Sequence, residues 1–401
     1  MGTLLRGIIV CLWICSVLGC GRSVPGVPID PVPANVPEGY RALYRELESD
    51  LSLPNPFLKN VRVREAGAPL FGVELPATAW HRGGRLPDDA QPGSPAPMLD
   101  RLRTLGAKFV CLHLLHPVLT REFTQNESYL AFYRNIAGEI RRRGFKLVVA
   151  LGVMPRESEL SVLAAGTAEL NRARFNSGLR QMAETILAEL RPDYLTVLSE
   201  PDTVAQDTGL PFSPAEFAAT VRHIVRGLDA GSTKLGAGTG TWAASDYLEE
   251  MGAIPELHYL DLRLHPVRYG FASDRISRAA DIARSRGKKL SIGAAWLQKE
   301  SSREFGRIAR ADVLAREAFS FWQPLDRRFV ETVVGIARSL GAEFCSFSRT
   351  EYLFATLEYS EEADRLTPAQ RMQRVEIQAM VRIPAGTLTP AGRRLRDLIA
   401  D

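Results

Sequence analysis

The chain has 401 residues, of which 45% are hydrophobic and 24% are charged, and it carries a net charge of +4 at pH 7. These proportions are typical of a globular body and exclude a chain too polar or too charged to bury a core. The small positive excess is spread along the chain, which excludes a concentrated basic surface for nucleic acid.

The first 19 residues read as an export signal. A short start with one positive charge, at Arg6, precedes the apolar run 7–18, which is too short to span a bilayer. The run ends in Val17-Leu18-Gly19-Cys20, which resembles a bacterial lipobox. That resemblance implies cleavage before Cys20 and lipidation of this residue. We therefore expect a lipid-anchored protein of the bacterial cell envelope, periplasmic or cell-surface; a plain signal peptide or an uncleaved anchor is the alternative.

Residues 20–38 form a proline-rich tether. Five prolines stand between Gly21 and Glu38. Proline has no backbone N–H and a fixed φ, so such a segment is extended rather than helical. The remaining residues, 39–401, are expected to form one domain. Its two cysteines, Cys111 and Cys345, lie in predicted strands and are expected to be buried thiols, because a domain this large needs no disulfide.

Short apolar segments alternate with longer segments of helical periodicity after the tether. Eight strands are predicted, at Leu70–Leu75, Phe109–Leu115, Lys146–Val153, Tyr194–Leu198, Lys234–Thr239, Tyr259–Leu264, Lys289–Ala294 and Glu343–Phe347. The predicted helices are Gly39–Leu51, Leu99–Leu105, Tyr129–Arg143, Asn171–Leu190, Pro214–Leu228, Ser273–Arg286 and Asp326–Leu340. Four helices lead into the next strand through a glycine suited to a left-handed cap, namely Gly106, Gly144, Gly287 and Gly341.

This alternation predicts an α/β fold, a single-domain (β/α)8 TIM barrel. The alternative is an open, doubly wound sheet, which usually carries a glycine-rich phosphate loop after its first strand. The first strand leads instead into Leu75-Pro76-Ala77-Thr78. The glycine-rich segment Lys234–Gly240 lies in the fifth unit and is a weak nucleotide signal. No cofactor is expected.

The carboxyl ends of barrel strands hold the chemistry in this fold, and polar or aromatic residues follow most of the predicted strands. The candidates are Glu74, His113, Ser199, Glu200, Trp242, Arg263, His265, Trp296, Arg349 and Glu351. Forked polar groups and flat indoles suit a saccharide.

Each candidate also has a structural interpretation. Glu74 could form an ion pair with Arg263 or Arg349, and His113 could be a core histidine. Trp80, Trp242 and Trp296 could be packing residues rather than a platform for sugar. Glu351 could be a surface glutamate.

One stretch resembles a known superfamily. The strand Tyr194–Leu198 followed by Ser199-Glu200-Pro201 resembles strand four of the retaining (β/α)8 glycoside hydrolases, such as cellulases and endo-galactanases, whose acid/base glutamate lies in an Asn-Glu-Pro motif. The resemblance extends over most of residues 68–355 and includes Leu260–His265. It implies a saccharide ligand, with Glu200 as the general acid/base. Ser199 replaces the family's asparagine.

The second catalytic group of that superfamily is missing from its usual place. The family's nucleophile is a glutamate at the end of strand seven, where this chain has Gly293 or Ala294. Neither residue can attack an anomeric carbon.

Other chemistries lack a signal. His113 and His116 need not face one centre, and no Cys/His cluster or calcium-loop pattern occurs, so no metal is expected. A Gly-x-Ser-x-Gly elbow is also absent from the sequence.

Three hypotheses follow from the sequence. The chain is a glycoside hydrolase with a relocated second carboxylate, Glu351 first and Glu74 second. Alternatively, it is a degenerate barrel that binds saccharide without cutting it. Third, it is a surface scaffold lipoprotein, which is favoured if the loops at 76–98 and 297–325 plug the barrel mouth. A monomer is expected in each case.

Overall fold

The computed structural model describes residues 32–53, 55–57, 68–79, 95–156, 158, 170–265 and 274–400. Residues 32–401 form one compact unit, separate from residues 1–31. The predicted signal, Cys20, most of the tether, Trp80 and most of the loop at 76–98 lie outside the described residues. Within the described ranges, no helix has both the length and the apolar composition needed to cross a bilayer.

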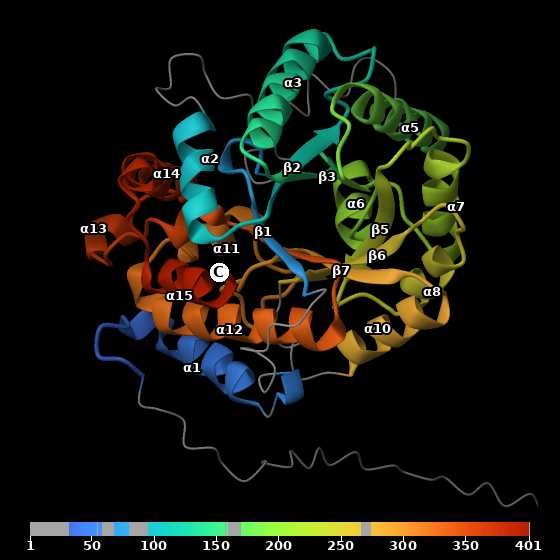
Figure 1. Cartoon of the computed structure of the whole chain (residues 1–401). Coiled ribbons are helices and arrows are strands. Elements are labelled where there is room, and N and C mark those ends of the chain that lie inside the picture. Colours follow the sequence, from blue (N-terminus) through green and yellow to red (C-terminus); the bar gives the residue numbers. More distant parts are fainter. Residues whose placement is uncertain are drawn as a thin grey trace, which may run out of the picture. The chain divides into compact units, whose positions relative to one another are not determined.

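Eight parallel strands close into a barrel in sequence order, which confirms the predicted fold (Figure 1). They are β1 (Leu70–Glu74), β2 (Phe109–His116), β3 (Lys146–Val153), β4 (Tyr194–Thr196), β5 (Lys234–Gly240), β6 (Tyr259–Leu264), β7 (Lys289–Ala295) and β8 (Phe344–Phe347). The register is regular except on β7. There it shifts between Ile292 and Ala294 opposite β6, and between Ile292 and Ala295 opposite β8.

An outer ring of helices covers the strands (Figure 1). Its members are α2 (Pro95–Leu105), α3 (Asn126–Arg142), α5 (Arg172–Glu189), α7 (Pro214–Val225), α8 (Asp246–Gly252), α10 (Arg275–Ser285), α12 (Gln323–Leu340) and α15 (Pro390–Ile399). The four glycines predicted as caps all have positive φ, for example 59° at Gly341, which ends α12. A left-handed residue closes the helix without the steric cost of a Cβ.

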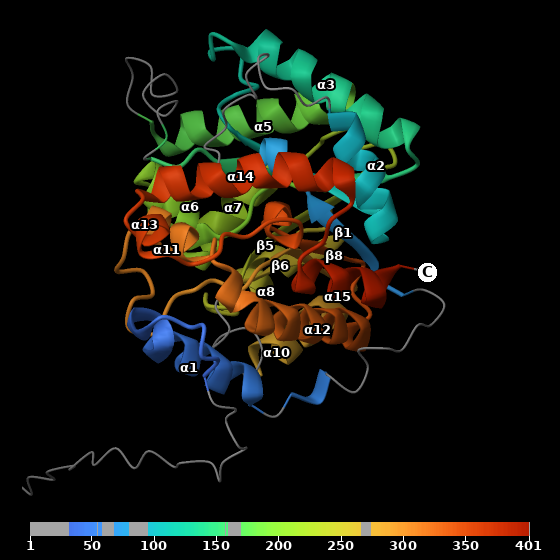
Figure 2. The same cartoon turned by 90° about the vertical axis from the view of Figure 1, so that its left-hand side faces the viewer.

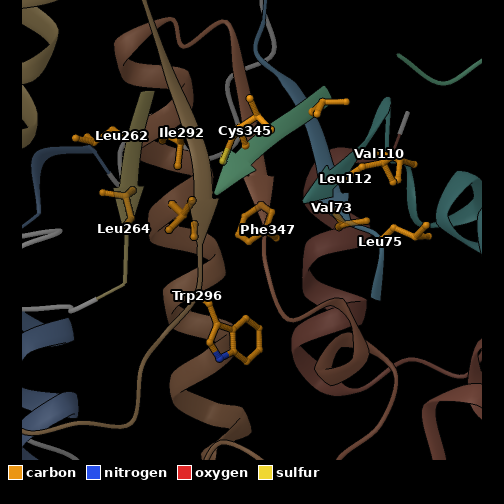
Figure 3. Packing of buried hydrophobic residues seen from close by; sticks show 14 of the residues in the cluster. Val73, Leu75, Val110, Leu112, Leu262, Leu264, Ile292, Trp296, Cys345 and Phe347 are labelled. Carbon is orange, nitrogen blue, oxygen red and sulfur yellow. The ribbon is translucent and has the colours of Figure 1, made fainter. Parts of the chain in front are cut away.

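Two apolar layers hold the barrel together. The larger layer lies between the strands and the helices, and Figure 3 shows part of it, including Val73, Ile292 and Phe347. The smaller layer fills the inside of the barrel at the amino ends of the strands. Its rings pack edge to face, with Tyr194 and Phe344 centroids 5.0 Å apart. Because these rings fill the amino end of the interior, polar side chains inside the barrel lie at its carboxyl end.

Several further helices follow strands β4, β7 and β8. They are α6 (Pro201–Thr208), α11 (Arg310–Arg316), the 3-10 turns η4 (Ser320–Trp322) and η5 (Thr350–Leu353), α13 (Glu361–Asp364) and α14 (Pro368–Ala385). Helix α14 packs against η5, α11 and α2. Because η5 directly follows β8, this extra layer covers the β8–β1 side of the barrel mouth.

The N-terminal helix α1 (Glu38–Ser52) lies against α12 in both views (Figures 1 and 2). Tyr44 stacks on Trp322 with ring centroids 5.7 Å apart. Glu46 accepts a hydrogen bond from the backbone N–H of Ser302, at 2.7 Å. The domain's first helix is thus tied to the long segment between β7 and α12.

Candidate active site

Glu200 stands at the carboxyl end of β4, in the half-buried zone of the barrel mouth. Its backbone is left-handed, with φ 56° and ψ 71°, and Pro201 starts α6 directly after it. A glutamate in this region is strained, and such strain gathers at functional sites. The side chain is 21% exposed, and its Oε2 accepts a hydrogen bond from Thr203 at 2.9 Å. The carboxylate is therefore both fixed and reachable from solvent.

Two aromatic rings pack together after the carboxyl ends of β5 and β6. The rings of Trp242 and His265 are 5.8 Å apart and tilted by 35°, and Trp242 Nε1 donates to Asp202 at 2.5 Å. Burial lowers the pKa of His265, an effect that the negative charge of Glu200 opposes. We call Ser199, Glu200, Asp202, Trp242 and His265 the open side of the mouth, since each retains some solvent exposure.

Arg263 connects Glu200 to a carboxylate deeper in the barrel. Its Nε lies 4.0 Å from Glu200 Oε1 and 3.1 Å from Asp261 Oδ2. The carboxyl groups of Glu200 and Asp261 thus both lie close to one guanidinium group. Asp261 is fully buried, and burial raises its pKa to about 6, against the lowering effect of Arg263.

The opposite side of the mouth is closed. Arg349, in a left-handed conformation after β8, is buried among three acidic side chains. Its Nε lies 3.3 Å from Glu317 Oε2 and 3.4 Å from Glu351 Oε1, and its Nη2 donates to the Tyr352 hydroxyl at 2.6 Å. Burial raises the pKa of Glu317 to about 7, although Arg349 works against this rise.

Glu74 joins the same group from β1. Its Oε1 accepts the backbone N–H of Arg349 at 2.5 Å, and its Oε2 lies 3.4 Å from His113 Nε2. Burial, reinforced by the charge of Glu351, raises the pKa of Glu74 to about 8. Both causes favour the neutral form of the Glu74 carboxyl in the folded protein. We call Glu74, His113, Glu317, Arg349, Glu351 and Tyr352 the buried network.

Strand β7 has little room for a side chain at Gly293, one of the two positions predicted to stand where the resembled superfamily has its nucleophile. A Cβ on Gly293 would lie 2.2 Å from both carboxylate oxygens of Asp261. The glycine thus makes space for an acidic group that reaches across from β6.

The ring of sequence candidates is divided between these two sides. Ser199, Glu200, Trp242 and His265 lie on the open side, with Arg263 beneath them. Glu74, His113, Arg349 and Glu351 lie in the buried network. Trp296 is buried (Figure 3). It stacks on Tyr352 with ring centroids 5.5 Å apart, so a saccharide could not lie on that face without displacing the tyrosine.

The segment 297–325 crosses part of the mouth. Phe305 packs on Trp242, with centroids 6.4 Å apart, and Arg310 pairs with Asp207 of α6 at 3.4 Å. The same segment supplies Glu317 to the buried network. This segment narrows the mouth but leaves Glu200 exposed.

Sequence reasoning missed Asp261 and Glu317. Asp261 had a signal, because Tyr259, Asp261 and Arg263 alternate along β6 and must point into the barrel together. Glu317 had none, since it follows a short helix in an irregular segment. In the described part of the chain, no group of three or more His, Cys, Asp or Glu side chains is placed to hold a metal ion.

Comparison with solved structures shows which proteins share this fold. The chain matches GH5_18 from Bifidobacterium longum subsp. longum with a TM-score of 0.51 and 12% identity, over 83% of this chain and 79% of that chain. It matches the exo-beta-1,4-mannosidase Op5Man5 from Opitutaceae bacterium strain TAV5 with a TM-score of 0.52 and 14% identity, over 85% of this chain and 61% of that chain. The protein has the fold of glycoside hydrolase (β/α)8 barrels.

The comparisons by sequence find nothing further. No family model matches the chain, and no curated protein matches it.

Proposed function

We propose that the protein binds a β-linked saccharide at the open side of the barrel mouth and hydrolyses it with Glu200 as general acid/base. One observation carries this proposal: a strained, partly exposed glutamate follows β4, and Asp202, two residues on, accepts a hydrogen bond from the half-buried indole of Trp242. The indole offers a flat apolar surface to the C–H face of a sugar, and Asp202 and His265 offer partners for its hydroxyls.

Hydrolysis requires a second carboxyl group, about 5–5.5 Å from the first for retention or about 6.5–9.5 Å for inversion. A base must be ionised at working pH. Glu74, whose pKa is raised to about 8, does not suit this role. Glu351 lies 3.4 Å from Arg349. Glu351 is therefore the first candidate base, and Glu74 suits a proton donor.

A second function is favoured by a specific observation. Asp261 occupies the space beside Gly293, and both Glu351 and Glu74 are buried. A barrel with this arrangement suits saccharide binding without cleavage.

The structural relatives support the choice of ligand. The Bifidobacterium longum protein has also been solved as a variant in complex with Manβ1-4GlcNAc, and this second structure matches the chain with a TM-score of 0.51. Op5Man5 is described as an exo-beta-1,4-mannosidase. We therefore place β-mannosides and other β-linked oligosaccharides first on the panel of substrates.

The test is turnover and binding on that panel with the wild type and three variants. Glu200→Gln should lower kcat/KM by about 10²–10⁴-fold, as for loss of a general acid/base. Glu250→Gln, an exposed glutamate of α8, should change nothing. If Glu351→Gln keeps the full rate, Glu351 is not the base. If the wild type binds saccharides but cleaves none, the non-hydrolytic function is correct.

We also propose that the protein is a monomer attached to a bacterial envelope membrane through a lipid on Cys20. The motif Val17-Leu18-Gly19-Cys20 and the prolines after it support this. Two or three acyl chains give stable attachment where one does not. Cys20→Ser should block processing or release the protein from the membrane fraction. Unchanged attachment, with the signal cleaved elsewhere, would refute the lipid anchor.

A further inference from the structure

An apolar stripe faces solvent on α14. Among the described residues, the large hydrophobic side chains that are exposed all belong to this helix: Ile377 (51% exposed), Met380 (38%) and Val381 (71%). Their spacing places them on one face of the helix. The opposite face is buried in the domain through Val375 and Ile383. Helix α14 is thus apolar on two sides, and only one of them is covered by this chain.

Arginines border the stripe. Arg374 and Arg382 are exposed on α14 itself, and Arg101 of α2 donates through Nε to the carbonyl of Pro384 at 2.8 Å. One of these charges is partly offset, because Arg374 lies 3.5 Å from Glu362. An apolar stripe flanked by guanidinium groups matches the boundary between anionic headgroups and acyl chains.

We propose that this stripe docks on an anionic phospholipid surface. Figure 2 shows α14 lying across the face of the domain turned to the viewer, without another helix in front of it. The side chains of Ile377, Met380 and Val381 enter the interfacial region, and the arginines contact phosphate groups. The proposal does not depend on the saccharide chemistry of the mouth.

Such a small stripe binds weakly when the protein is free in solution. The tether proposed above changes this. Residues 21–37 in extended form reach about 50 Å at roughly 3.1 Å per residue, which keeps the domain at high effective concentration near the lipid. A contact that is weak from solution then becomes well populated.

Docking would also orient the mouth. Because α14 packs on η5, which follows β8, the stripe lies near the carboxyl end of the barrel. A docked domain therefore works within a short distance of the membrane surface.

The test uses a chain that begins at Gly21 and retains the whole compact unit, so neither a lipid nor the signal contributes. Val381→Cys is labelled with a polarity-sensitive fluorophore; the native thiols, Cys111 and Cys345, are buried. The matched control carries the label at Arg284→Cys on α10, where the native side chain is 72% exposed. Vesicles of phosphatidylglycerol or of phosphatidylcholine are added to a final lipid concentration in the millimolar range.

The Val381 label should move to a less polar environment with phosphatidylglycerol vesicles, and the Arg284 label should not. Partitioning should fall about fivefold in Arg382→Gln, and by less in Arg374→Gln because Glu362 partly offsets that charge. No change at Val381, or an equal change at Arg284, would refute the proposal. A change without lipid that grows with protein concentration, with dimers in sedimentation, would show that a second copy covers the stripe and would also refute it. Because no saccharide is present, either result leaves the proposed function untouched.

Discussion

The two sides of the barrel mouth use similar residues for different purposes. On the open side, Glu200 shares Arg263 with Asp261 and remains 21% exposed. In the buried network, Arg349 is surrounded by Glu74, Glu317 and Glu351, all nearly inaccessible to solvent. Pairs of arginine and carboxylate therefore line a candidate ligand site on one side and form a sealed core on the other. The two sides differ in how far their carboxyl groups are buried.

The largest difference in stability between the two sides is expected for a substitution of Arg349. Arg349→Ala should lower the free energy of unfolding by about 3–5 kcal/mol, because it leaves buried carboxyl groups without their cation. Glu200→Gln on the open side should change it by less than about 1 kcal/mol. Urea unfolding of both variants checks this. Equal losses would show that the two sides are equally buried.

A smaller effect is expected at the boundary between the sides. Gly293→Ala should cost about 1–3 kcal/mol, because the added Cβ would meet Asp261 at 2.2 Å. Ser291→Ala, on the same strand and also buried, adds no atoms and serves as the control. A neutral Gly293→Ala would mean that Asp261 moves freely.

The smallest effect concerns pH. The pKa of Glu74 is about 8 in the folded protein against 4.5 for the free group, so the native state holds this proton more tightly. Its contribution to stability is complete below pH 4.5 and is lost as pH rises through 8. Glu317, with a pKa of about 7, acts in the same direction. His116, with a pKa lowered to about 4, acts in the opposite direction, but only below pH 6.5.

Stability should therefore fall between pH 6.5 and pH 8, by at most about 2 kcal/mol for one proton retained over this interval. Urea midpoints at the two pH values measure this. Glu74→Gln should flatten the dependence. A stability that rises over this interval would contradict the assignment of a protonated Glu74.

Much of the fold could be predicted because the apolar patterns are local. The bounds of β3 and β6 agree with the sequence prediction at both ends. Strand β4 ends earlier, at Thr196, although Val197 still donates a backbone hydrogen bond to Gly236 of β5. Such differences of one or two residues depend on the hydrogen-bond criterion that defines a strand end, and the chain follows the predicted path.

The C-terminal helices were missed although the sequence marks them. Thr367 and Gln370 form a capping box at the start of α14, with Pro368 in its first turn. Helix α14 adds the cover that seals the buried network, so its omission left Glu351 looking as if it could be a surface residue. Which candidates are exposed depends on contacts between distant segments, and these have no local pattern.

The contact between Gly293 and Asp261 also limits how the protein can change. A side chain at position 293 requires the Asp261 carboxylate to shift or to be replaced by something smaller. That replacement removes the carboxylate that holds Arg263 in place beside Glu200. A carboxylate at position 293 is therefore costly while Asp261 is present, and replacing Asp261 alone also gives a less stable protein. Selection acting one substitution at a time would tend to preserve the present arrangement of the mouth.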